Sequence, residues 1–283
     1  MRACAGAAFV VLLFFGCCIG PAYADAWNNE WIVPSDAAVR VNANFGHIRV
    51  DTGDFTRVKA GIRTTGWSVS KDEVSVTANQ LEDRIDLEVK LRSGRKVWQF
   101  GRSVVIELTV PRSASLDLHT DYGDITTQGV QGAIRADSNK GAIAVAGGRG
   151  SIQLRASEGD INASGLDGTL VAGTIKGSIH AAGRYDGMDV QTGQGDLDVS
   201  AQAGSALSSS WRLQTGKGNI LLRMPDGLGA DLDVTADSGQ ITIDFPVAAS
   251  GEMEAGAVRG PMNGGGPGLW IHTVRGNIRI EKR

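Results

Sequence analysis

Residues 123–179 read GDITTQGVQ GAIRADSNK GAIAVAGGR GSIQLRASE GDINASGLD GTLVAGTIK GSI, divided here into pieces of nine residues. Each piece opens with Gly, any residue, then Ile or Leu, and apolar and polar residues alternate from there. This period of two is typical of a half-buried strand, and the glycine supplies a bend. The structural repeat comprises Gly123, Ile125, Gly132, Ile134, Gly141, Ile143, Gly150, Ile152, Gly159, Ile161, Gly168, Leu170, Gly177 and Ile179.

A strand this short cannot bury its apolar face alone, whereas a stack of such units can. Alternate pieces are the most alike: Gly123-Asp124-Ile125, Gly159-Asp160-Ile161 and Gly195-Asp196-Leu197 share one phrase. We therefore predict an all-β fold, a parallel β-solenoid with two-sheet coils of about 18 residues. An N-terminal β-sheet cap is expected to cover the first coil, because an open end exposes unpaired strand edges.

The chain divides into five expected segments. Residues 1–24 read as a signal peptide, and residues 25–112 as a β-rich capping region that precedes the repeats. The solenoid repeats are expected over residues 113–247 and a Gly-rich loop over residues 248–268. Residues 269–283 are expected to form strands that close the end of the solenoid.

The first residues have the features of an export signal. Arg2 precedes an apolar run from Ala7 to Gly20, and Ala22-Tyr23-Ala24 has the small-x-small pattern of a cleavage site. Cleavage after Ala24 predicts a periplasmic, secreted or cell-surface protein without another membrane span. It also removes Cys4, Cys17 and Cys18, so no disulfide is expected. Acylation of Cys17, which would anchor the protein to lipid, is the second interpretation.

The charge is nearly balanced. The chain has 28 Lys and Arg against 31 Asp and Glu, a net charge of −3, and the signal peptide contains only Arg2 among them. No basic cluster stands out, which argues against nucleic acid as the main partner. A protein or glycan of the cell envelope or surface is expected instead. The sequence leaves the oligomeric state open.

A family resemblance extends over nearly all of the chain after the signal peptide. It is carried by Val105-Ile106-Glu107-Leu108-Thr109-Val110-Pro111, by Tyr122-Gly123-Asp124-Ile125 and by the later Gly-x-Ile phrases. These motifs resemble a bacterial family of exported β-strand-repeat proteins, a domain of unknown function often called "putative adhesin". The resemblance implies adhesion, with no ligand or catalytic residue to transfer.

Two ion-binding hypotheses are weighed against structural ones. The stretch Gly147-Gly148-Arg149-Gly150-Ser151 resembles a calcium-binding β-roll turn, but Ser replaces the necessary Asp, so no metal site and no cofactor are expected. The residues Asp124, Asp160 and Asp196 share one register and would form an acidic ladder. Ordinary turn chemistry beside glycine is the favoured explanation for them.

No catalytic constellation is evident, so we do not expect an enzyme. The four histidines, His47, His119, His180 and His272, are scattered. Basic residues that could line one face, as in polysaccharide-cleaving β-helix enzymes, are Arg135, Arg155, Lys176 and Arg184. Aromatic residues expected to seal the core are Trp67, Trp98 and Trp270.

The sequence thus predicts an exported, non-enzymatic binding protein that offers flat sheet faces to a partner. A self-associating structural or regulatory envelope component is the alternative, and a polysaccharide-cleaving enzyme ranks third. The sequence alone leaves the binding residues unknown.

Overall fold

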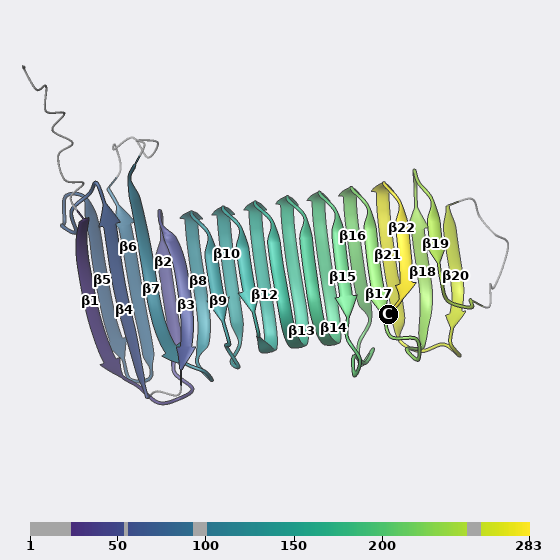
Figure 1. The fold of residues 1–283 in the computed structure, drawn as a ribbon, viewed down its shortest axis with the longest axis horizontal. Coiled ribbons are helices and arrows are strands. Elements are labelled where there is room, and N and C mark those ends of the chain that lie inside the picture. Colours follow the sequence, from purple (N-terminus) through teal and green to yellow (C-terminus); the bar gives the residue numbers. More distant parts are fainter. Residues whose placement is uncertain (1–23, 54–55, 93–100, 248–255) are drawn as a thin grey trace, which may run out of the picture.

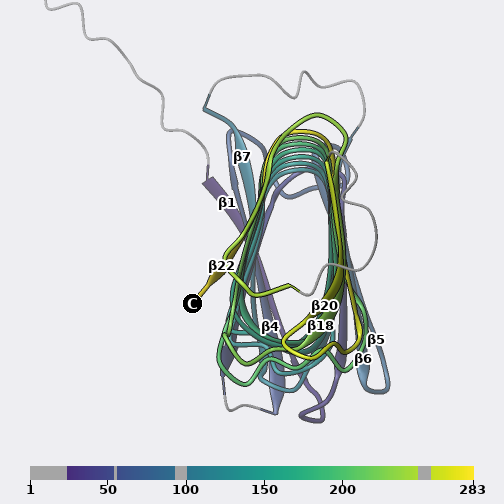
Figure 2. The same ribbon diagram turned by 90° about the vertical axis from the view of Figure 1, so that its right-hand side faces the viewer.

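The computed structural model describes residues 24–53, 56–92, 101–247 and 256–283. Within these residues the chain forms 22 β-strands and no helix, so the predicted all-β class is confirmed. Over the same residues, nothing folds into a helix long and apolar enough to cross a membrane. The strands join into one sheet that winds into an elongated, solenoid-like rod (Figure 1). Seen along the rod, the winding is flattened, with two long sides that we call side A and side B (Figure 2).

Side A contains twelve strands or strand halves, and their order along the rod differs from their order in the chain. From one end of the rod to the other, side A consists of β5 (Val74–Leu81), β6 (Arg84–Leu91), β2 (Ala38–Ala43), β8 (Ser115–Tyr122), β10 (Ile134–Lys140), β12 (Arg149–Glu158), the second halves of β13 (Ile161–Lys176) and β14 (Ile179–Gln194), β16 (Trp211–Lys217), β21 (Gly268–Arg275), β18 (Ala230–Ala236) and β20 (Ala257–Met262).

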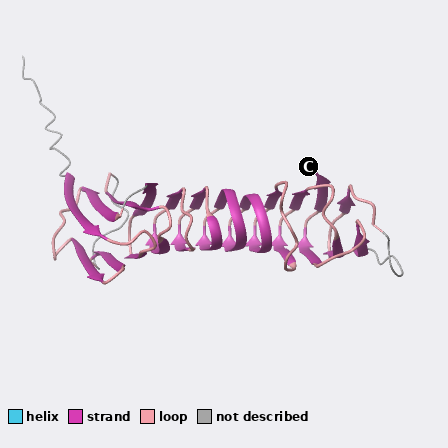
Figure 3. Cartoon of the chain, turned by 90° about the horizontal axis from the view of Figure 1, so that it is seen from below, coloured by secondary structure: helices cyan, strands magenta, loops and turns pink. Residues whose placement is uncertain are grey.

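Side B runs beside it, and Figure 3 shows the two rows of strands along the rod. In the same direction, side B consists of β1 (Ala24–Ile32), β4 (Arg57–Thr65), β7 (Ser103–Pro111), β3 (His47–Gly53), β9 (Ile125–Gln128), β11 (Ile143–Ala146), the first halves of β13 and β14, β15 (Leu197–Ala201), β17 (Ile220–Met224), β22 (Ile278–Lys282) and β19 (Ile241–Ile243).

The middle of the rod follows the sequence repeat. Ile134 pairs in parallel with Ile152 on side A, and Ile143 pairs with Ile161 on side B. Side chains alternate between inside and outside, as in β10, where buried and exposed residues take turns. The repeat residues Ile125, Ile134, Ile143, Ile152, Ile161, Leu170 and Ile179 are each at most 1% exposed. Each such aliphatic side chain stabilises the fold by about 1.5–3 kcal/mol relative to an exposed one.

One corner between the two sides is built from glycine. At Gly141 the backbone φ is 151°, and a Cβ would lie 2.1 Å from the carbonyl oxygen of Gly123 in the coil before. Only a residue without a side chain permits coils to stack this closely. We call this the glycine corner, and its members, in their order along the rod, are Gly46, Gly123, Gly141, Gly159, Gly177, Gly195, Gly218, Gly276 and Gly239.

Near the start of the rod, the chain inserts its first coil into the stack. Strands β2 and β3 come before β6 and β7 in the sequence, yet they lie between those strands and β8 and β9. Antiparallel strands β1, β4 and β5 lie at this end of the rod.

Near the other end, the last coil is also inserted. Strand β21 pairs in parallel with both β16 and β18, and β22 pairs with both β17 and β19. The expectation that residues 269–283 close the end therefore differs from the structure, in which β18, β19 and β20 lie beyond them. The reason is that both edges of the last coil find partners, with Gly276 stacked between Gly218 and Gly239.

Candidate functional site

A groove of about 820 Å³ crosses the outer surface of side A, from β8 to β16. It is lined by side chains that alternate with the buried core residues of the same strands. The side chains that matter most for its chemistry are His119, Arg135, Arg155, Ile175, Gln191 and Gln214. A smaller hollow of about 430 Å³ adjoins it and shares Arg135.

The floor of the groove is formed by glycine. In register, Gly173 lies between Arg155 of β12 and Gln191 of β14. A Cβ at Gly173 would meet only the carbonyl oxygen of Gln191, at 3.9 Å, so the space above this residue is open. Gly193 and Gly216 extend the floor, and a Cβ at either would lie 2.6 Å from a neighbouring carbonyl oxygen. The groove therefore exists because side chains are missing from consecutive coils.

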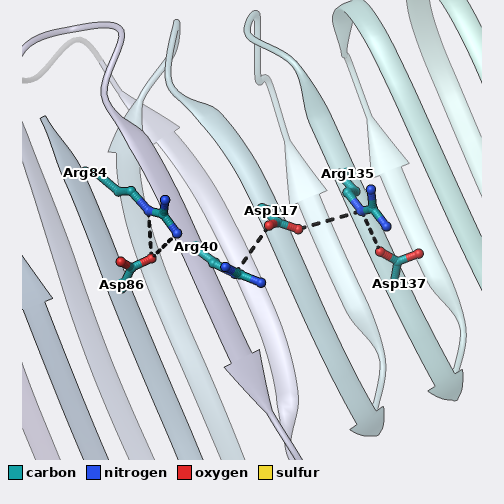
Figure 4. A network of polar contacts seen from close by, with 6 residues as sticks. All are labelled: Arg40, Arg84, Asp86, Asp117, Arg135 and Asp137. Carbon is teal, nitrogen blue, oxygen red and sulfur yellow. Dashed lines mark hydrogen bonds and ion pairs between the residues drawn. The ribbon is translucent and has the colours of Figure 1, made fainter.

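Charged side chains of alternating sign lead along side A into the groove (Figure 4). Asp117 lies between two arginines, with Oδ2 3.4 Å from Nε of Arg40 and Oδ1 3.9 Å from Nε of Arg135. Arg135 donates from Nε to Asp137 Oδ2 at 2.9 Å, and this hydrogen bond raises the pKa of Arg135. Arg84 and Asp86 form a further pair at 2.8 Å. These exposed pairs contribute about 0–1 kcal/mol each to stability.

The alternation ends at Arg155. Its register partners are Asp137, which already holds Arg135, and Gly173, which has no side chain. Among the described residues, no carboxylate forms an ion pair with Arg155. The guanidinium of Arg155 is exposed and lines the groove as a free positive charge.

A basic edge runs beside the groove, on the strand positions just before the glycine corner. In register it contains Lys140, Glu158, Lys176, Gln194, Lys217 and Arg275. Glu158 accepts ion pairs from Lys140 at 3.8 Å and from Lys176 at 3.4 Å. Within the described chain, Lys217 and Arg275 have no acidic partner. The groove and its edge thus have a surplus of positive charge in a chain whose net charge is negative.

Apolar surface is also present in the groove. Ile175, which lines the groove, is 63% exposed; Val171, four residues before it on β13 and outside the groove lining, is 39% exposed. Both point outward because they occupy the alternate positions to buried Leu170, Ala172 and Thr174.

The basic residues singled out in the sequence do not all meet. Arg135 and Arg155 line the groove, and Lys176 lies on the basic edge. Arg184 lies elsewhere, where it pairs with Asp167 and with Asp186. The sequence did not single out Gly173, Gln191 and Gln214, because only strand pairing brings them beside Arg155.

The acidic residues beside the glycine corner form hydrogen bonds between coils. Asp124 Oδ1 accepts the backbone N–H of Ala142 at 2.8 Å, and Asp160 Oδ1 accepts that of Ser178 at 2.8 Å. Asp196 Oδ1 does the same for Asn219 at 2.7 Å. These carboxylates replace main-chain acceptors at the turn, which is the turn chemistry favoured from the sequence.

The remaining repeat glycines lie at the opposite corner, which is less regular. Gly150 and Gly168 have φ values of 101° and 132°, whereas a Cβ at Gly132 would lie 2.3 Å from the carbonyl oxygen of Ala114. Of the expected cleavage residues, Ala22 lies outside the described residues and Ala24 is the first residue of β1.

The tryptophans differ from expectation at one position. Trp67 is 1% exposed and packs edge-on against Phe45, and Trp98 lies outside the described residues. Trp270 faces outward on side A, where the Arg212 guanidinium lies 5.2 Å from its ring centroid. The alternation in β21 puts Leu269 and Ile271 inside instead. Trp211 fills the core beside Tyr185.

Among the residues that the structure describes, the groove lining contains one carboxylate, Asp137, and one imidazole, His119. Arg135 holds this carboxylate. In the described part of the chain, no group of three or more His, Cys, Asp and Glu residues could hold a metal ion.

Three histidines pair singly with an aspartate: His47 with Asp124, His119 with Asp121 and His272 with Asp237, at 3.2–3.3 Å. At Gly147–Ser151, Arg149 pairs with Asp167 at 3.4 Å.

Comparison with known proteins identifies the fold family. A crystal structure of a "putative lipid binding protein" from Parabacteroides distasonis aligns with a TM-score of 0.51 and 13% identity, covering 92% of this chain and 97% of the other. A "putative adhesin" from Bacteroides fragilis gives 0.44 and 12% over 91% and 97%, and a "putative cell adhesion protein" from Clostridium sporogenes gives 0.32 and 12% over 91% and 100%. No curated protein matches the chain. A family model does match, over residues 40–281, and the chain belongs to that family, Toastrack DUF4097.

Proposed function

We propose that this protein is an exported, non-enzymatic binding protein that presents side A to a protein or glycan of the cell envelope or cell surface. The groove carries the proposal. It is open, it spans six strands, and it combines a glycine floor with charged, amide and aliphatic side chains. Such a surface suits an extended partner bound by many weak contacts. The names of the similar structures, adhesin, cell adhesion and lipid binding protein, accord with binding rather than catalysis.

Export is part of this proposal. Residues 1–24 would act as the signal peptide, with cleavage after Ala24, where β1 begins. Strands β1, β4 and β5 would act as a cap on two-sheet coils of about 18 residues. The periplasm and the cell surface are the compartments that fit this assignment.

The proposal is tested by adding the fluorescently labelled chain from Asp25 onward to intact cells and to isolated envelopes. Saturable binding is expected, and Gly173→Tyr is expected to abolish it because the added ring fills the groove. The backbone at Gly173 is ordinary and the space is open, so the variant should fold. Ala144→Tyr, on the outer surface of side B, is the matched control and should bind like the unchanged protein. Equal binding by both variants would overturn the role of the groove.

A cleaving enzyme is the competing explanation for a groove of this kind. Hydrolysis of a glycosidic bond commonly uses two carboxylic groups on opposite sides of the bond. If concentrated protein released reducing ends from envelope polysaccharide, and Asp137→Asn abolished the release, the non-enzymatic assignment would be wrong.

Self-association is the second candidate function, and one observation favours it. Ile32 is 79% exposed at the end of β1, and Leu81 is 63% exposed at the end of β5. The Gln80 side chain donates to the carbonyl oxygen of Ile32 at 3.1 Å, so the two apolar residues lie near each other at one end of the rod. Size-exclusion chromatography over a range of concentrations tests this function: an assembly that Leu81→Lys disrupts would support it, and a monomer at all concentrations would exclude it.

A further inference from the structure

We propose that the ligand of the groove is a linear acidic polysaccharide, held by Arg155 midway along the groove and by Lys217 and Arg275 on the basic edge near its β16 end. This inference rests on the proposed function, since it assigns a ligand class to the same groove. It follows from the positions of the free charges, the chemistry of the lining between them and the pairing of the strands beneath.

The free cations lie at the two ends of the glycine floor, which occupies the half of the groove from β12 to β16. Arg155 lies on β12, and Lys217 lies on β16, three coils farther along the rod. With strands about 4.8 Å apart, these positive charges are separated by about 14 Å along the rod, and Lys217 lies three strand positions, or about 10 Å, to one side of the register of Arg155. Arg275 follows on the next strand, β21. A ligand that neutralises both ends must therefore be extended and must bear negative charges at intervals along its length.

The lining between the cations suits sugar rings. The amides of Gln191 and Gln214 can donate to and accept from hydroxyl groups, while exposed Ile175 offers apolar contact to the C–H face of a ring. Gln191 is already oriented, because its Nε2 donates to Asp189 Oδ1 at 2.7 Å. Gly173 leaves room for a ring directly beside Arg155, whose planar guanidinium can bind a carboxylate or sulfate through two hydrogen bonds.

Other polyanions fit less well. A peptide commonly binds by adding a strand to a free sheet edge, but β13, β14 and β16 are paired on both edges here. Single-stranded nucleic acid is commonly bound by stacking its bases on aromatic residues, and His119 is the single aromatic ring in the lining. A flat anionic bilayer would contact the basic edge without entering the glycine-floored groove.

The experiment measures binding of the chain from Asp25 onward to immobilised polygalacturonate and hyaluronate, with neutral dextran and phosphatidylglycerol vesicles as comparisons. Saturable binding is expected to the two acidic polymers, weakening as NaCl is raised, and not to dextran. Arg155→Gln is expected to weaken it about tenfold, because a charge-assisted hydrogen bond is lost. Arg49→Gln is the matched control: Arg49 is also exposed and also lacks an ion pair among the described residues, but it lies on side B. It should leave binding unchanged.

The outcomes separate this inference from the proposed function. Equal losses from Arg155→Gln and Arg49→Gln, or binding to vesicles alone, would overturn the polysaccharide inference. If Gly173→Tyr abolished binding to cells but Arg155→Gln did not weaken it, the groove would still be the binding site, but its ligand would not be an acidic polysaccharide. If the unchanged protein bound neither cells nor polymers, the proposed function would fail as well.

Discussion

The hydroxyl group of Ser138 donates a hydrogen bond to the carbonyl oxygen of Gly123, 15 residues before it, at 3.1 Å. The same bond recurs along the glycine corner, at 2.9–3.1 Å, and secures the turn in successive coils. The donors are Thr120, Ser138, Thr174, Thr192, Thr215 and Thr273, and the acceptors are Gly46, Gly123, Gly159, Gly177, Gly195 and Gly218. The row is interrupted at Ala156, which occupies the register position between Ser138 and Thr174 and has no hydroxyl group to donate to the carbonyl oxygen of Gly141.

Restoring this bond should stabilise the protein. Ala156→Ser places a hydroxyl at the interrupted position and is expected to raise the free energy of unfolding by about 1 kcal/mol, measured by urea denaturation. Ala172→Ser is the control, because Ala172 is buried away from the corner and a hydroxyl there gains no such acceptor. If Ala156→Ser lost as much stability as Ala172→Ser, the hydroxyl-to-carbonyl hydrogen bonds at the glycine corner would not stabilise the fold.

A second row is interrupted in the same coil. Asp124, Asp160, Asp196, Asn219 and Asn277 each accept a backbone N–H from the neighbouring coil, but Ala142 has no side-chain acceptor for the N–H of Asp160. Ala142→Asn is therefore expected to raise the melting temperature by a few degrees, corresponding to about 1 kcal/mol. Ala144→Asn, two residues later on the outer surface, should leave it unchanged.

The glycine corner predicts a sharp contrast between two glycines. Gly141→Ala forces a Cβ against the carbonyl oxygen of Gly123 at a φ of 151°, so a loss of more than about 3 kcal/mol is expected. Gly173→Ala, in open space with ordinary backbone, should change stability by less than about 1 kcal/mol. Chemical denaturation of the two variants checks the contrast. Similar losses would show that the close stacking of the coils is not what requires glycine.

Tyr185 predicts the response of the fold to alkaline pH. Its hydroxyl is buried beside Trp211 without a hydrogen-bond partner among the described residues, and burial raises its pKa above the ordinary value of 10.0. Above about pH 10 the unfolded chain ionises this group while the folded chain does not. Stability therefore falls by up to about 1.4 kcal/mol per pH unit there, and this contribution is fully present below pH 10.

Tyr185→Phe removes the group and should lessen the alkaline loss. Unfolding of both proteins in urea at pH 8 and pH 11 measures the difference, since the two proteins share every other ionisable group. At pH 8 the variant should be at least as stable, because it removes a buried hydroxyl that lacks a partner. An identical loss between pH 8 and pH 11 in both proteins would contradict the burial of Tyr185.

The sequence predicts what each coil contains better than how the coils are ordered. Alternation around Ile125 and Ile143 identifies buried positions because inside and outside differ in polarity at every second residue. The order of coils is not local: Gly239-Gln240-Ile241 and Gly276-Asn277-Ile278 look alike, so the sequence does not reveal which of them lies at the end. The groove was missed for a similar reason. Gly173 resembles any turn glycine until β12 and β14 are known to flank it.

The insertion of β21 and β22 has a consequence for how the molecule is assembled. These strands are synthesised after β18, β19 and β20, yet they lie between them and the rest of the rod. In a nascent chain, β18 and β19 must therefore either stay unpaired from β16 and β17 or separate from them again before residues 268–282 can insert between them. A chain that ends before Gly268 would contain the antiparallel pair β18 and β20 but would lack β21 and β22, which connect this pair to the rest of the rod. The rod can therefore be continuous up to β20 only in a chain that includes β21 and β22.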